Sequence, residues 1–124
     1  MIILISNSSE LPIYQQIAEQ IKEQIMSKNL TEGDLLPSIR SLARELKISV
    51  ITTKKAYSEL EKERFVESVP GKGTFVAKAN LEYLTEMRLK KIEENLLSAL
   101  DDAKTINLKR EELIKMLITL DEEL

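Results

Sequence analysis

The chain has 124 residues, with 18 basic and 21 acidic side chains and a formal net charge of −3. It has no histidine and no cysteine, which excludes imidazole general-base catalysis, thiol nucleophiles, disulfides and the ordinary zinc sites. The longest apolar run spans residues 1–5, too short for a transmembrane helix or a signal peptide, so we expect a soluble cytoplasmic protein.

The first 28 residues predict a short strand followed by a helix. Residues 2–5 are apolar and end at a turn-prone, serine-rich segment, which is typical of a strand. Ser8 or Ser9 can cap the following helix, which has Pro12 in its first turn and extends to about Lys28. Four isoleucines at helical spacing form one apolar stripe: Ile13, Ile17, Ile21 and Ile25. The glutamines and glutamates between them are therefore expected to face water.

Two further helices are predicted after a turn in which Gly33 supplies the permissive backbone. Ser38 opens the first of these helices, which ends near Lys47. Ser49 is the expected N-cap of the next helix, because its hydroxyl can accept from the amide three residues on, and that helix extends to about Arg64. Only two residues remain between the two helices, so they must cross steeply, as in a helix-turn-helix pair.

The segment after the third helix has the pattern of a β-hairpin. Residues 65–69 and 74–76 are predicted strands, and they flank a glycine-containing turn at residues 70–73. A hairpin in this position, with Lys72 at its tip, would be the wing of a winged helix.

Residues 79–124 predict two more helices, separate from a first domain at residues 1–78. Their apolar residues recur at helical spacing up to Lys104, and Asn107 can cap the final helix. A two-helix hairpin has too little core to stand alone, so a second copy of the chain is expected to complete the assembly. The residues expected at this dimer interface are Leu81, Leu84, Leu89, Ile92, Leu96, Leu100, Leu113 and Leu117.

The third helix carries the strongest indication of function. At 100° per residue, one of its faces is ordinary core: Thr53, Ala56, Tyr57 and Leu60. The opposite face is mostly polar or basic: Ile51, Lys54, Lys55 and Ser58. A basic face on the second helix of a tight helix-turn-helix is where a recognition helix presents side chains to the major groove of DNA.

Three motifs resemble one family of bacterial transcription regulators, the GntR family. The first is LPSIRSLA at residues 36–43, followed by T-x-x-KAY-x-x-LE at 52–61 and GKGTFV at 71–76. The resemblance covers about residues 10–77, and it implies a winged helix-turn-helix that binds DNA. The short helical tail is similar to that of the YtrA subfamily, in which it dimerises. The chain has Val50 where many family members carry an arginine.

The resemblance also implies which residues contact DNA. Arg40 lies where family members contact the DNA backbone, and the two lysines of the third helix are expected to contact phosphates. Ser49 is first of all the cap of the third helix, and contact with a phosphate is its second role. For Thr52, a local role in the helix is the alternative to contact with a phosphate or a base. The full set of expected DNA-binding residues is Ser38, Arg40, Ser49, Val50, Ile51, Thr52, Lys54, Lys55, Gly71 and Lys72.

Together these patterns predict a mainly α (α+β) protein, with an N-terminal winged helix-turn-helix and a C-terminal two-helix dimerisation tail. The expected function is sequence-specific binding of double-stranded DNA by a homodimer that represses transcription from an inverted-repeat operator. The alternative is a winged-helix module for protein–protein contact. No catalytic arrangement, metal site, cofactor or membrane partner is predicted, and whether a small-molecule effector exists is left open.

Overall fold

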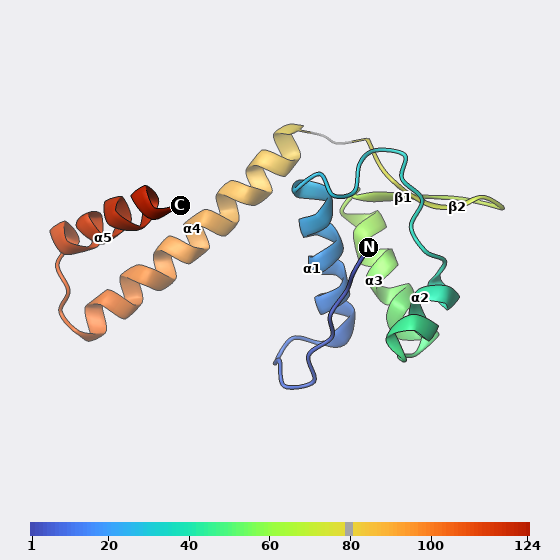
Figure 1. The fold of residues 1–124 in the computed structure, drawn as a ribbon, viewed down its shortest axis with the longest axis horizontal. Coiled ribbons are helices and arrows are strands. Elements are labelled where there is room, and N and C mark those ends of the chain that lie inside the picture. The colour runs from blue at the N-terminus through green and yellow to red at the C-terminus, as the bar shows by residue number, and fades with distance from the viewer. Residues whose placement is uncertain (79–80) are drawn as a thin grey trace. The chain divides into compact units, whose positions relative to one another are not determined.

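The computed structural model describes residues 1–78 and 81–124, which contain five helices and one two-stranded sheet (Figure 1). The chain divides into two compact units, Met1–Asn80 and Leu81–Leu124. The predicted winged helix-turn-helix, followed by two C-terminal helices, is confirmed. Within the described residues, every helix is too short or too polar to cross a membrane.

The N-terminal unit is built around helix α3 (Val50–Lys62), which packs against α1 (Ile13–Met26) and α2 (Ile39–Leu46) (Figure 1). The isoleucine stripe of α1 forms part of the core, as predicted, with Ile17 and Ile21 completely buried. The other largest fully buried side chains of this unit are Leu42, Thr53, Leu60 and Val66.

The turn between α2 and α3 is held by its own backbone and by two serine caps. The hydroxyl of Ser38 accepts from the amide of Ser41 at 3.1 Å. The hydroxyl of Ser49 accepts from the amide of Thr52 at 3.0 Å, and this cap was predicted. Lys47 adopts a left-handed conformation with φ of 57°, which ends α2 and reverses the chain direction. The two helices are therefore fixed at a tight turn.

The predicted wing is an antiparallel hairpin of β1 (Val66–Val69) and β2 (Gly73–Val76), in which Val66 pairs with Val76. The loop before α2 runs beside β2, because the amide of Leu36 donates to the carbonyl of Thr74 at 2.9 Å. A Cβ at Gly73 would lie 2.9 Å from the side chain of Leu35, and this glycine has a φ of +124°. Glycine at this position thus lets the wing approach the loop closely.

The predicted strand at residues 2–5 is absent, because this extended segment pairs with glutamine side chains instead of another strand. The amide side chain of Gln20 accepts from the amide of Leu4 at 2.9 Å and donates to its carbonyl at 2.7 Å. Gln16 makes the same pair of bonds with Ser6, and Gln24 donates to the carbonyl of Ile2. Four residues of helix rise about 6 Å, close to two residues of strand, so the two repeats match. The expectation that these glutamines only face water is therefore wrong.

The start of α1 also differs from the prediction. Its N-cap is Pro12, and no side chain caps the helix. The hydroxyl of Ser9 accepts instead from the amide of Leu11 at 3.1 Å, which stabilises the loop before the helix.

The C-terminal unit consists of α4 (Leu81–Thr105) and α5 (Arg110–Glu123). Asn107 has a φ of 56°, and the next amide, that of Leu108, donates to the carbonyl of Ala103 at 2.9 Å. These are features of a helix end, so Asn107 terminates α4 rather than capping α5, whose N-cap is Lys109.

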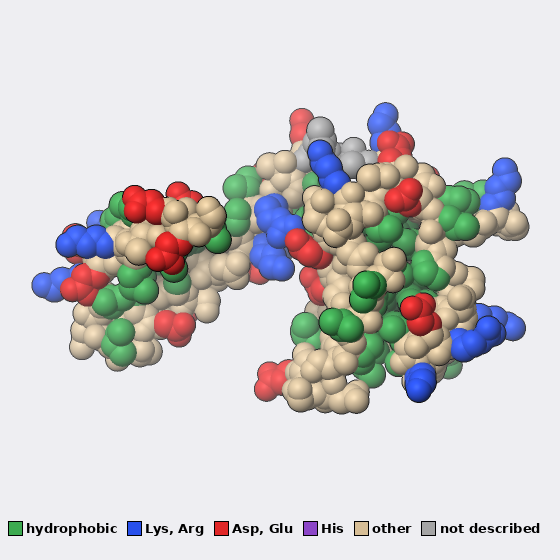
Figure 2. Space-filling model, in the orientation of Figure 1, with side chains coloured by type: hydrophobic (Ala, Val, Ile, Leu, Met, Phe, Trp, Pro, Cys, Tyr) green, Lys and Arg blue, Asp and Glu red, His purple; other side chains and the backbone are tan. Residues whose placement is uncertain are grey.

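Apolar side chains remain at the surface of the C-terminal unit (Figure 2). Leu84 and Leu113 are half-buried, and α5 has no buried residue. The side chain of Leu81, also expected at the interface, lies outside the described side chains. The other expected interface residues are between 45% and 60% exposed: Leu89, Ile92, Leu96, Leu100 and Leu117.

Candidate nucleic-acid interface

The predicted division of α3 into a core face and an exposed face is confirmed. Thr53, Ala56, Tyr57 and Leu60 are all buried. Ile51, Lys54, Lys55 and Ser58 are all exposed. The N-terminal half of this helix therefore presents two lysines and an isoleucine to solvent.

A buried tyrosine fixes α3 against the chain segment that leads into α2. The hydroxyl of Tyr57 donates to the carbonyl of Pro37 at 2.6 Å, across 20 residues of sequence. Burial raises the pKa of the Tyr57 hydroxyl well above its ordinary value near 10, because the phenolate would be desolvated. The neutral hydroxyl therefore holds α3 at a fixed position relative to the start of α2.

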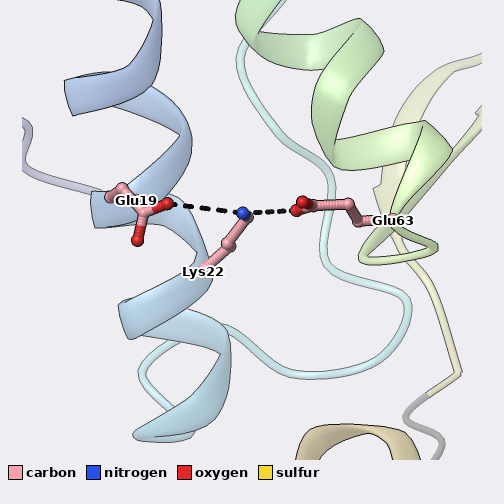
Figure 3. A network of polar contacts seen from close by, with 3 residues as sticks. All are labelled: Glu19, Lys22 and Glu63. Atoms are coloured by element: carbon pink, nitrogen blue, oxygen red, sulfur yellow. Dashed lines mark hydrogen bonds and ion pairs between the residues drawn. The ribbon is translucent and has the colours of Figure 1, made fainter. Parts of the chain in front are cut away.

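A buried lysine links α1 to the end of α3 (Figure 3). The ammonium of Lys22 pairs with Glu63 and, at 3.4 Å, with Glu19, and it lies 5.7 Å from the centre of the Phe65 ring. Burial by itself lowers the pKa of Lys22, but the two carboxylates outweigh it, so the pKa is raised. Sequence reasoning missed this lysine, although its position four residues after the buried Ala18 places it on the core face of α1.

Two arginines of α2 flank the N-terminal end of α3. Arg40 and Arg44 are one helical turn apart, and both are exposed. They line a shallow surface pocket together with Ala43, Ile48 and Val50. The structure thus brings Arg40 and Val50, both predicted site residues, to one place. It adds Arg44, whose spacing of four residues from Arg40 was the available signal.

The remaining predicted residues on or beside α2 and α3 lie in three settings. The hydroxyls of Ser49 and Thr52 are hydrogen-bonded to each other at 2.7 Å, so these two side chains meet at the first turn of α3. The ammonium of Lys55 lies 4.0 Å from the centre of the Tyr14 ring, which holds it against α1. Ser38 caps α2, as described above.

Two of the expected residues, Gly71 and Lys72, lie in the wing rather than on the helices. Both are exposed in the turn between β1 and β2, and Gly71 has a φ of +76°. The amide of Lys72 donates to the carbonyl of Val69 at 3.0 Å, which closes the turn and leaves the lysine at its tip. Figure 2 shows blue basic side chains both beside α2 and at the end of the wing. This face therefore combines a basic helix-turn-helix with a basic hairpin.

Comparison with known proteins identifies a family that shares this arrangement. The model of the family described as "Bacterial regulatory proteins, gntR family" matches residues 13–76, which include α1, α2, α3 and the wing. The HTH-type transcriptional repressor YtrA of Bacillus subtilis is 38% identical over 101 residues, covering 82% of this chain and 78% of that protein.

Two solved structures extend the comparison. YtrA from Sulfolobus acidocaldarius, a GntR-family transcription factor, is 35% identical with a TM-score of 0.58, covering 98% of each chain. The DNA-binding domain of AraR in complex with its operator ORX1 is 29% identical with a TM-score of 0.55, covering 62% of this chain and 96% of that one. The first two of these relatives are thus named a transcriptional repressor and a transcription factor, and the third is bound to an operator. The chain therefore belongs to the GntR family of bacterial transcription regulators, with the YtrA proteins among its relatives.

Proposed function

We propose that this regulator is a repressor that binds an inverted-repeat operator as a homodimer. The single observation that carries the proposal is the exposed, basic N-terminal half of α3, which Ser49 caps and which α2 and the wing flank with further basic residues. The relative YtrA of Bacillus subtilis is named a repressor, which supports the direction of regulation.

In this proposal, α3 enters the major groove and the residues around it contact phosphates. Arg40 and Lys54 are exposed, so they can reach phosphate oxygens without disturbing the core. The amides at the first turn of α3, next to the hydroxyls of Ser49 and Thr52, add partial positive charge at the same place. Gly71 and Lys72 in the wing supply a second point of contact.

We further propose that residues 1–78 form the DNA-binding domain and residues 79–124 the dimerisation tail. A row of leucines and isoleucines that stays about half exposed over two helices is the kind of surface that a second identical tail covers. Two copies related by a two-fold axis would place two α3 helices on half-sites about 34 Å apart, or a multiple of that distance. The operator would therefore be an inverted repeat.

Fluorescence anisotropy with a labelled duplex, measured from low to high salt, tests the DNA contact. We expect the logarithm of affinity to fall steeply with the logarithm of salt concentration. Arg40→Ala and Lys54→Ala should each weaken binding to every duplex and reduce the salt slope by about one unit. Lys62→Ala, at the other end of α3, is the matched control and should leave the slope unchanged. Unaltered affinity in the Arg40→Ala, Lys54→Ala double variant would contradict this docking and favour a protein-binding winged helix.

A further inference from the structure

The sequence at the start of α3 is unfavourable for a helix. Four β-branched residues follow one another: Val50, Ile51, Thr52 and Thr53. Such side chains lose rotational freedom in a helix, so they form helices less readily than alanine does. Helix propensity therefore does not explain why four β-branched residues occur together at this position.

The structure explains the two threonines but not Ile51. Thr53 is buried, and its hydroxyl donates to the carbonyl of Ser49 at 3.1 Å. The hydroxyl of Thr52 pairs with that of Ser49. The side chain of Ile51 is 80% exposed, so burial in the free protein does not account for it. A residue that departs from local preference without stabilising the fold is a candidate for a binding role.

The chemistry of α3 indicates what Ile51 could bind. The helix contains no arginine, asparagine or glutamine, so Lys54 and Lys55 are its only side chains that could read guanine or adenine through paired hydrogen bonds. The proposed function assigns Lys54 to a phosphate, and Lys55 lies against the Tyr14 ring. The apolar group that the major groove displays is the C5-methyl group of thymine. Ile51 lies three residues before Lys54 on the same exposed face, so a phosphate contact by Lys54 would bring Ile51 close to the bases.

We propose that Ile51 recognises the C5-methyl group of a thymine in the operator by apolar contact. The inference rests on the proposed function, and it adds the chemical class of base that the helix selects. Val50 is less suited to this contact, because it is 46% exposed and lines the pocket beside Arg40 and Arg44, toward α2. A β-branched side chain also has little rotational freedom left to lose when it binds.

The test begins with selection of tight-binding duplexes from a randomised library by the full-length protein. Each thymine of the selected sequence is then replaced by deoxyuridine, which keeps base pairing and removes only the methyl group. We expect one thymine in each half-site at which this replacement weakens binding about three- to fivefold, the effect of uncovering one methyl group.

Ile51→Ala should bind the thymine and deoxyuridine duplexes equally, and Ile51→Val should keep part of the difference. Ile2→Ala is the matched control, because Ile2 is 77% exposed in the N-terminal segment, and it should discriminate as the wild type does. The melting temperature of Ile51→Ala should be unchanged or slightly higher, since alanine is the better helix former. That result separates a lost contact from a damaged fold.

Two outcomes would overturn the inference: wild-type protein that is insensitive to deoxyuridine at every position, or Ile51→Ala protein that keeps the wild-type sensitivity. Should Ile51→Ala fail to fold, the comparison of wild type with Ile51→Val decides in the same way. A protein that selects no duplex at all would refute the proposed function itself, and the inference with it.

Discussion

The two units of the chain have similar amphipathic helices but cover their apolar faces to very different extents. The isoleucine stripe of α1 is buried against α3, and Leu60 of α3 is completely buried. The corresponding stripe of α4 stays largely uncovered, and Leu96 is 52% exposed. An apolar stripe in a sequence thus predicts which face of a helix is covered, but it leaves open whether the same chain or another copy covers it.

The largest expected effect comes from truncating matched leucines in the two units. Leu60→Ala removes a fully buried side chain and should lower the free energy of unfolding by about 2–5 kcal/mol. Leu96→Ala, in an isolated chain, should cost less than about 0.5 kcal/mol, because the side chain is half exposed. Urea unfolding at several protein concentrations measures both.

The concentration dependence decides what Leu96 contacts. If a second tail covers Leu96, the cost of Leu96→Ala rises toward that of a buried leucine, and the stability of the wild type increases with protein concentration. A small cost and no concentration dependence would contradict the dimer.

The next effect is loss of the dimer by introduced charge. Ile92→Glu with Leu96→Glu puts four carboxylates into a two-fold interface, so we expect a 14.2 kDa monomer in sedimentation and an intact N-terminal unit. Affinity for an inverted repeat should fall about a hundredfold or more, because a monomer bound to one half-site no longer holds a second subunit next to the other half-site. Lys90→Glu with Ser98→Glu, on the far face of α4, is the control and should stay dimeric. Wild-type protein that sediments as a monomer would refute this architecture.

The elements that the sequence predicted well are those governed by neighbouring residues. Ser38 opens its helix and Ser49 caps its helix as expected, and the hairpin turn lies where Gly71 and Gly73 place it. In each case the determining bond or dihedral angle lies within three or four residues, so the local sequence contains the cause. The same holds for the core face of α3, whose helical spacing identifies it.

The absent strand at residues 2–5 and the overlooked Lys22 have a common physical origin in contacts between distant segments. An apolar run at residues 2–5 favours a strand, but its pairing partners are glutamine side chains 16 to 22 residues away along the chain. The ion pair of Lys22 with Glu63 is equally non-local. For the candidate site, helical spacing placed Ile51 and Lys54 on the exposed face of α3, whereas the contact of Lys55 with Tyr14 required the structure.

The buried ion pair gives a smaller effect that is confined to the N-terminal unit. Lys22→Met leaves Glu63 without its cationic partner in a mostly covered position, and we expect a loss of about 2 kcal/mol in the free energy of unfolding. Combining it with Glu63→Gln should recover part of that loss, since the only carboxylate then left without Lys22 is that of Glu19, whose side chain is half exposed. Thermal unfolding of the two variants tests this, and the size of the dimer, measured in parallel, should not change. Equal stability of Lys22→Met and wild type would show that the ion pair contributes nothing.

The smallest expected effect is a loss of stability at high pH that originates in the N-terminal unit. Burial raises the pKa of Tyr57 in the folded state above its unfolded value near 10, and the carboxylates raise that of Lys22. A group whose pKa is raised by folding keeps its proton longer in the folded state. Its stabilising contribution is therefore complete below the unfolded pKa and is lost as the pH rises toward the folded one.

For Tyr57 alone, the loss amounts to about 1.4 kcal/mol by pH 11, because the unfolded tyrosine ionises while the folded one stays neutral. Tyr57→Phe should remove this part of the pH dependence, while costing about 1 kcal/mol at pH 7 through loss of the hydrogen bond to the carbonyl of Pro37. Urea unfolding between pH 7 and pH 11 separates the two losses of stability. The loss of the hydrogen bond is independent of pH, whereas the loss through ionisation of the unfolded tyrosine grows above pH 10. A Tyr57→Phe variant that loses stability as steeply as the wild type above pH 10 would assign the alkaline transition to other groups, with Lys22 the first to test.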